Sequence, residues 1–143
     1  MQTKPQIRVL IADDHQFFAE ALGLALDADP RLDVVGYARD GQEVVELARA
    51  LGPDVIMMDI EMPVLDGVTA TRRLLKTSPA RVAILTASAQ PDDPVRARDA
   101  GASAYLTKGC SARDVIEAVV ELASPLNPGF GLAPLQFQAA LAH

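Results

Sequence analysis

The sequence predicts an α/β protein with a doubly wound, five-stranded parallel sheet and five helices. Two observations lead to this fold class. Short apolar runs recur along residues 7–123, and amphipathic segments with helical spacing separate them. The apolar runs do not alternate with polar residues, so we expect helices to cover both faces of the sheet. Ligands of such sheets bind at the carboxyl ends of the strands.

The first strand, residues 7–12, is expected to lead into a helix that packs on the sheet. Phe18, Leu22 and Leu26 recur at helical spacing and define the apolar stripe of this helix. The stripe is widened by Phe17, Ala21 and Leu24. The helix ends before Pro30, because proline disfavours helical conformation at the residue that precedes it.

The remaining elements continue the alternation of strand and helix. Val44, Leu47 and Leu51 share one face of the next expected helix. Gly101 closes a later helix, and Ser111 is the expected N-cap of the last one. In chain order the elements are a strand at 32–38, a helix at 40–51, a strand at 54–59, a helix at 67–76, a strand at 81–87, a helix at 92–102, a strand at 103–107 and a helix at 111–123.

The composition indicates a globular protein and excludes some functions. The net charge of −6 and the scattered basic residues argue against direct nucleic-acid binding. No apolar run approaches the ~20 residues of a membrane span, and the N-terminus lacks a signal-peptide pattern. The single cysteine, Cys110, is typical of a reducing compartment. We therefore expect a cytoplasmic protein without membrane contact.

The chain is expected to divide into a sheet domain, residues 1–123, and a linker or appended tail, residues 124–143. The tail has three prolines, two glycines and no acidic or basic side chain except His143. Two interpretations stay open. The segment is a linker to a further domain, or its apolar side chains pack on the sheet domain of its own or a neighbouring chain and support a dimer. Those side chains are Leu135, Phe137 and Leu141.

Polar side chains follow the apolar strands at the edge where all the strands end. Clustered carboxylates suit Mg²⁺, and an ammonium and a hydroxyl beside the ion would hold a phosphoryl group. A carboxylate at such a place can act as a nucleophile. Each residue alone has an ordinary structural explanation, such as a helix N-cap, but their combination favours function. The polar residues are Asp13, Asp14, Asp59, Thr86, Thr107 and Lys108, and the small Ala87 follows Thr86.

Four segments resemble the response regulator receiver domains of two-component signalling, which have a flavodoxin-like fold. They read IADDH, DVIMMDIEMPVLDG, ILTASA and AGASAYLTKG, and ADDH and AGASAYLTK further resemble the NarL/FixJ subfamily. The resemblance implies that a sensor histidine kinase donates a phosphoryl group to an aspartate. The domain then changes its surface to control a partner or an output domain, in this subfamily to regulate transcription. NarL/FixJ regulators usually continue into a DNA-binding domain, so we expect a stand-alone receiver or a piece of a longer regulator.

The resemblance also assigns the metal ligands. Asp59 is the phosphoacceptor and shares the Mg²⁺ ion. Asp14 contacts the ion directly, and Asp13 contacts it mainly through water. Glu61 lends its backbone carbonyl. Pro63 and Gly67 fit the tight loop and the helix entry after the phosphoacceptor.

The phosphate ligands and the switch follow by the same resemblance. Lys108 pairs with the phosphate, Thr86 is the switch hydroxyl, and the small Ala87 leaves the site open. Tyr105 is expected to turn from outward to inward as Thr86 moves toward the phosphate. Loss of phosphate is expected to be tuned by Glu61 and Ser88.

The first helix is the expected docking site for the kinase. His15, Gln16 and Phe17 open this helix beside the acidic pocket. Phe17 is expected to belong partly to the core, because it flanks the apolar stripe. The loop after Lys108 departs from many receivers, because Gly109 stands where proline is common, so a cis peptide is not expected there. A homodimer on phosphorylation is a further expectation.

Two other functions stay open. Acid-dehalogenase-type phosphatases also use an aspartate nucleophile and Mg²⁺, but their nucleophile ends the first strand in an Asp-x-Asp arrangement. A receiver-like binding module that is never phosphorylated usually lacks an acid, the threonine or the lysine, and all are present here. Turnover of a phosphomonoester would indicate the phosphatase, and stable labelling of Asp59 the receiver. Nucleotide binding is disfavoured, because no G-x-G-x-x-G or P-loop occurs.

Overall fold

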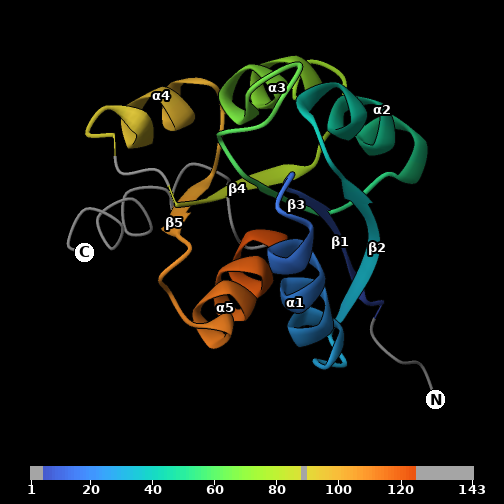
Figure 1. The fold of residues 1–143 in the computed structure, drawn as a ribbon. Helices are drawn as coiled ribbons and strands as arrows, with labels where there is room; N and C mark the ends of the chain where they lie inside the picture. The colour runs from blue at the N-terminus through green and yellow to red at the C-terminus, as the bar shows by residue number, and fades with distance from the viewer. Residues whose placement is uncertain (1–4, 88–89, 125–143) are drawn as a thin grey trace.

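The computed structural model describes residues 5–87 and 90–124, and these fold into one parallel sheet with helices on both faces (Figure 1). The strands run in the order β2-β1-β3-β4-β5, and every pair is parallel. The strands are β1 (Ile7–Ala12), β2 (Leu32–Ala38), β3 (Val55–Met58), β4 (Arg81–Thr86) and β5 (Ala104–Thr107). The helices are α1 (Gln16–Asp27), α2 (Gly41–Leu51), α3 (Gly67–Leu74), α4 (Asp93–Asp99) and α5 (Ala112–Ala123). The predicted fold class is confirmed.

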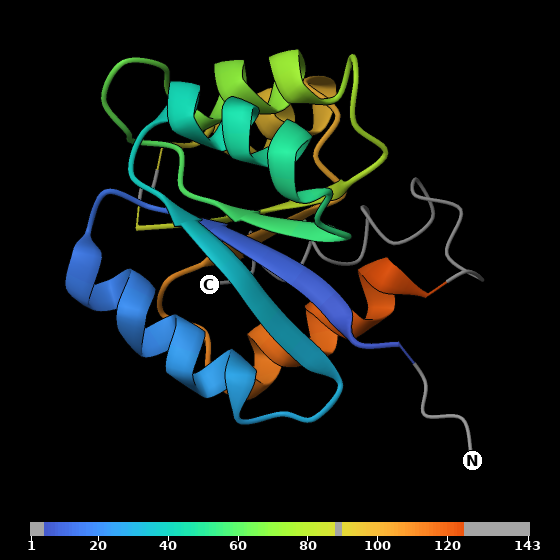
Figure 2. The ribbon, with the colours of Figure 1, turned by 90° about the vertical axis from the view of Figure 1, so that its right-hand side faces the viewer.

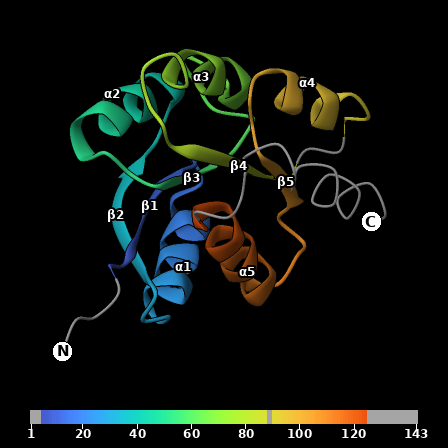
Figure 3. The same ribbon diagram turned by 180° about the vertical axis from the view of Figure 1, so that it is seen from behind.

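The helices form two layers around the sheet. Helices α1 and α5 lie on one face, and α2, α3 and α4 lie on the other, as Figures 2 and 3 show from two further sides. Successive strand residues point to opposite faces, so Val9 and Ile11 join the buried cluster under α1 and α5. Leu10 and Ala12 join the cluster under α2, α3 and α4. This two-sided burial explains why the strand sequences are apolar without alternation.

Side-chain caps set several helix ends. Asp40 accepts a hydrogen bond from the Glu43 backbone N–H at the start of α2. Asp66 accepts one from the Thr69 backbone N–H at the start of α3. Ser111 caps α5 as predicted, in a reciprocal capping box with Asp114. Gly101 follows α4 with a φ of 109°, a conformation that side chains other than glycine rarely adopt. The helix predicted at 92–102 is shorter, because α4 ends at Asp99.

The apolar stripe of α1 is narrower than predicted. Phe17, expected partly in the core, is 90% exposed, and Leu24 is also exposed. Ala21 lies on the surface as well. These three residues are spaced four and three apart, so they form a stripe of their own on the side of α1 opposite the buried residues. The buried residues of α1 are Ala19, Leu22, Gly23 and Leu26. The second stripe therefore faces solvent.

Three remaining expectations concern the tail, membrane spans and the peptide bond after Lys108. The tail prediction falls on residues outside the described part, apart from Ser124. Among the helices of the described residues, none has both the length and the apolar character that crossing a bilayer requires. All peptide bonds of this part are trans, including the bond between Lys108 and Gly109.

Candidate metal and phosphoryl site

Backbone hydrogen bonds place the predicted site residues immediately beyond the paired parts of the strands. The Asp13 N–H donates to the Ala38 carbonyl at 3.0 Å, and the Asp59 N–H donates to the Ala12 carbonyl at 2.9 Å. The Lys108 N–H donates to the Thr86 carbonyl at 2.9 Å. These bonds extend the sheet ladder by one residue on each strand, so the side chains project from a rigid edge.

Lys108 compensates the charge of the buried carboxylates. Its Nζ lies 2.8 Å from Asp13 Oδ2 and 3.3 Å from Asp59 Oδ2. The same ammonium lies 4.5 Å from the centre of the Phe18 ring, which covers it from the α1 side. Burial acts to lower the pKa of Lys108, but the hydrogen bond to Asp13 and the charge of Asp59 outweigh it and raise this pKa. Lys108 therefore stays charged between the two acids.

The Asp59 carboxyl group is the most perturbed acid at this edge. It is 3% exposed. Burial raises its pKa, and the neighbouring charge of Asp13 raises it further. The charge of Lys108 and a hydrogen bond from the Thr86 side chain act in the opposite direction without cancelling the rise. A buried carboxylate that faces a second carboxylate is stabilised by any further cation that enters the site.

The loop after Asp59 is held by close backbone packing. A side chain at Gly67 would collide with the backbone carbonyl oxygen of Asp59, and the Gly67 N–H donates to the Ile60 carbonyl at 2.7 Å. Val64 in this loop has a φ of 70°, which is unfavourable for a β-branched residue. Strain of this kind is concentrated at functional sites. The predicted tight loop around Pro63 and Gly67 is therefore present.

Thr86 and Tyr105 lie on the neighbouring strands, and both are buried. The Tyr105 ring is 3% exposed and packs in the cluster under α2, α3 and α4. The expected outward starting position is therefore not the one that the structure has, because the ring is already packed inside this cluster. Burial, followed by the charge of Asp93 and then of Asp59, raises the pKa of Tyr105 to about 12. Ala87, next to Thr86, is exposed.

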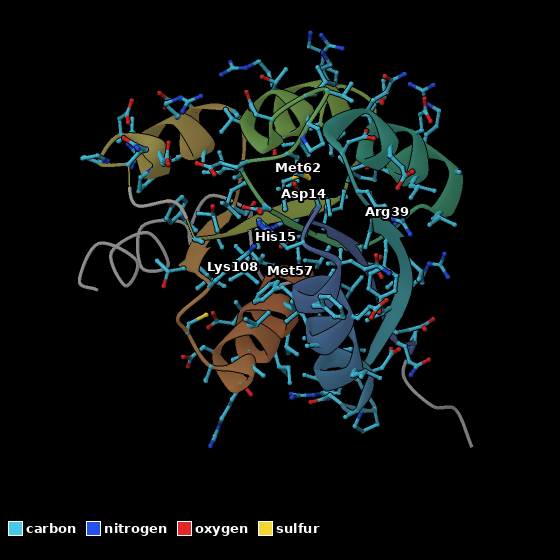
Figure 4. The ribbon with its side chains drawn as sticks, viewed as in Figure 1. Asp14, His15, Arg39, Met57, Met62 and Lys108 are labelled. Atoms are coloured by element: carbon cyan, nitrogen blue, oxygen red, sulfur yellow. The ribbon has the colours of Figure 1, made fainter. Side chains whose placement is uncertain are left out.

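His15 also belongs to this pocket, although its position in the sequence indicated only a role in docking. Its Nδ1 lies 3.1 Å from Asp13 Oδ1, 3.4 Å from Asp14 Oδ1 and 3.7 Å from Asp59 Oδ2. Figure 4 shows Asp14, His15 and Lys108 in the same region of the molecule. The sequence feature that could have indicated this role is a histidine, a common metal ligand, directly after the acidic pair.

The donor set fits a divalent cation. Ligand atoms of Asp13, Asp14, His15 and Asp59 all lie within 4.8 Å of one another. Beside them is a pocket of about 520 Å³, lined among others by Asp14, Glu61, Met62, Asp66 and Arg96. Oxygen ligands with space for water suit Mg²⁺. Glu61 is exposed at this mouth, and Ser88 lies outside the described residues.

Comparisons with known proteins agree with this geometry. The model of the response regulator receiver domain family matches residues 9–120. The chain therefore belongs to the response regulator receiver domain family, and it is a signalling domain of two-component systems.

The individual relatives include a response regulator and a methylesterase. Response regulator GacA of Pseudomonas aeruginosa is 38% identical over 114 residues, which are 79% of this chain and 53% of that protein. Protein-glutamate methylesterase/protein-glutamine glutaminase 2 of Photobacterium profundum is 44% identical over 104 residues, which are 71% of this chain and 26% of that protein. The chain spans about half of the first relative and a quarter of the second.

Among solved structures, the signal receiver domain of the response regulator NarL from Mycobacterium tuberculosis is similar. The TM-score is 0.81 at 32% identity, and the match covers 84% of this chain and 98% of that one. The match agrees with the predicted likeness to the NarL/FixJ subfamily.

Proposed function

We propose that the chain is a phosphorylation-activated switch that accepts a phosphoryl group on Asp59 from a sensor histidine kinase. One observation carries this proposal. The Asp59 carboxylate is buried between an ammonium, a hydroxyl and a second carboxylate: Lys108 lies 3.3 Å away, and Thr86 donates to it. This arrangement supplies a nucleophile, cationic stabilisation and a hydrogen-bond donor at one point.

In the proposed reaction an Asp59 oxygen attacks the phosphorus of the kinase phosphohistidine. The new O–P bond forms as the P–N bond breaks, and the departing imidazole takes up a proton. Lys108 pairs with a phosphoryl oxygen and remains close to Asp13, while the open side of the pocket at Ala87 admits the donor. Mg²⁺, held by Asp14, Asp59 and the Glu61 carbonyl and through water by Asp13, would neutralise the phosphoryl oxygens.

The bound phosphate is proposed to favour one of two surfaces. A phosphoryl group adds nearly two negative charges and strong acceptor oxygens, so Thr86 shifts its hydrogen bond from Asp59 to the phosphate. Tyr105 is already buried, and phosphate is proposed to stabilise this inward arrangement over an outward one. The affected surface is formed by α4, β5 and α5.

The proposed setting is a cytoplasmic pathway. The kinase is the upstream partner, and the output is a homodimer, an attached output domain or both. The 39% identity to the transcriptional regulatory protein LiaR of Bacillus subtilis supports transcription regulation as the output. Residues 1–123 are proposed as the receiver and 124–143 as a linker or tail. Glu61 and Ser88 are proposed to set the rate of phosphate loss without affecting phosphate acceptance.

Labelling with a small phosphodonor tests the proposal directly. The wild-type chain is expected to gain one phosphoryl group in the presence of Mg²⁺ and none with a chelator, as measured by intact mass. Asp59→Asn should gain none. Asp99→Asn, which changes an exposed aspartate at the end of α4, should label like the wild type. Undiminished labelling of Asp59→Asn would refute the assignment, and steady turnover of a phosphomonoester would indicate a phosphatase instead.

A further inference from the structure

His15 is placed to contribute a nitrogen ligand to the acidic pocket. It is the N-cap residue of α1 but makes no side-chain cap hydrogen bond. Its Nδ1 atom instead faces the carboxylates, at 3.1 Å from Asp13 Oδ1 and 3.4 Å from Asp14 Oδ1. Ligand atoms of one metal ion at bond lengths of about 2.1 Å lie roughly 3 to 3.5 Å apart. The distance from the imidazole nitrogen to Asp14 Oδ1 lies within this range, and the 3.7 Å to Asp59 Oδ2 lies slightly beyond it.

The same side chain has freedom to leave the pocket. It is 62% exposed, so water can replace it without a buried cavity. The backbone of His15 is fixed independently, because its N–H donates to Asp13 Oδ1 at 2.8 Å. The imidazole is therefore held at the rim of the pocket, where its Nδ1 lies within hydrogen-bond distance of Asp13 Oδ1 and of Lys108 Nζ. A ligand of this kind binds only ions that accept nitrogen.

The chemistry of the ion decides whether the nitrogen is used. Mg²⁺ takes oxygen ligands and retains several waters. Imidazole suits ions of the first transition row, and their affinity for such sites rises from Mn²⁺ toward the end of the row. Lys108 and the His15 N–H engage both oxygens of Asp13, each at 2.8 Å, whereas Lys108 lies farther from Asp59 Oδ2, at 3.3 Å. The oxygens left for an ion therefore come mainly from Asp14 and Asp59. A nitrogen from His15 would complete a mixed set.

We propose that His15 is a selective ligand, which coordinates Mn²⁺ or Zn²⁺ together with Asp14 and Asp59 and stays uncoordinated when Mg²⁺ is bound. The inference rests on the proposed function, because it places the transition ion in the pocket of the proposed magnesium site. The pocket then prefers a transition ion to Mg²⁺ by the free energy of one imidazole ligand. Which ion occupies the phosphoacceptor pocket thus depends on a residue that takes no part in phosphoryl transfer.

Titration calorimetry of the metal-free chain without a polyhistidine tag tests this selectivity. His15→Ala should weaken Mn²⁺ and Zn²⁺ binding by about tenfold or more and leave Mg²⁺ affinity nearly unchanged. The chain contains two histidines, so His143→Ala removes the same group elsewhere and should change none of the three affinities. Equal losses for Mg²⁺ and Zn²⁺ in His15→Ala, or no loss at all, would overturn the inference.

Pulsed electron paramagnetic resonance of the Mn²⁺-loaded chain gives a readout that does not depend on affinity. A nitrogen modulation from a directly bound imidazole is expected in the wild type and in His143→Ala, and it should be absent in His15→Ala. If no nitrogen modulation occurs in the wild type while Asp59 still labels, the inference is wrong and the proposed function stands. If the nitrogen signal is present and Asp59 does not label, the proposed function is wrong and the metal site stands.

Discussion

The two sides of the pocket are built in different ways. The metal side, defined here as Asp13, Asp14, His15 and Asp59, carries carboxylates and an imidazole at the ends of β1 and β3, and Asp14 and His15 are exposed. The switch side, defined as Thr86, Asp93 and Tyr105, lies along β4, β5 and the start of α4, and all three side chains are buried. Even Asp93 is 2% exposed, with its charge balanced by Arg96 at 3.1 Å.

This difference separates chemistry from transmission. An open cluster of charges can bind an ion and a phosphoryl group without rearranging the core. A closely packed interior responds to a small displacement by adopting another discrete arrangement. The metal side therefore suits phosphate acceptance, and the switch side suits the coupling of that event to the surface of α4, β5 and α5. The two sides meet at Asp59, which Thr86 contacts by a hydrogen bond.

The largest effect is expected from removing Asp14, the exposed aspartate of the metal side. Both Asp13 oxygens are engaged, one by the His15 N–H and one by Lys108. Asp14 is exposed and is left to face the ion directly. Asp14→Ala should therefore weaken Mg²⁺ binding by about tenfold or more, and Asp13→Ala should weaken it less. Calorimetric titration with Mg²⁺ measures both, and the reverse order would contradict this division of roles.

A smaller effect is expected from the exposed second stripe of α1, formed by Phe17, Ala21 and Leu24. This stripe belongs to neither side of the pocket. Phe17 is 90% exposed, so Phe17→Ala should change the free energy of unfolding by no more than about 0.5 kcal/mol. We expect this variant to receive phosphate more slowly from the kinase and at the normal rate from a small phosphodonor. The exposed Leu24 lies on the same stripe, and Leu24→Ala serves as a comparison. Equal slowing with both donors would show that Phe17 acts on the pocket itself.

The smallest effect concerns stability without metal. Burial and Asp13 raise the pKa of Asp59 above its ordinary value of 3.8. Between the unfolded and the folded pKa the folded state binds more protons, so this group lowers stability as pH rises through that range. Asp59→Asn removes this penalty and should raise the melting temperature at neutral pH in chelator. The gain should vanish below about pH 4. A lower melting temperature at neutral pH would contradict the sign.

Most of the fold could be predicted from the sequence, because strands that are buried on both faces consist of uninterrupted apolar residues. Asp13, Asp59 and Lys108 could be assigned to one edge of the sheet, because each follows the end of one of these apolar strands. The faces of α1 could not be separated, because Phe17 and Phe18 are equally apolar and periodicity does not say which stripe meets the sheet. The backbone of a helix allows both until tertiary packing selects one.

The direction of side chains was the harder part of the site. The rotamer of His15 depends on the charges that surround it, and a sequence pattern does not contain these distances. The state of Tyr105 was likewise open, because an aromatic residue on β5 fits both an outward and an inward position. Its burial at 3% follows from packing in the cluster under α2, α3 and α4, which only the assembled layers define.

Hydrogen exchange of the phosphorylated chain tests most directly whether the two sides are coupled through Thr86. Phosphorylation of the wild type at Asp59, in the presence of Mg²⁺, should change amide protection in α4 and β5. Thr86→Ala should accept phosphate at Asp59 but show no such change, and Thr77→Ala, which changes an exposed threonine after α3, should behave like the wild type. If phosphorylated Thr86→Ala shows the full wild-type change in α4 and β5, the proposed coupling through Thr86 and Tyr105 is contradicted.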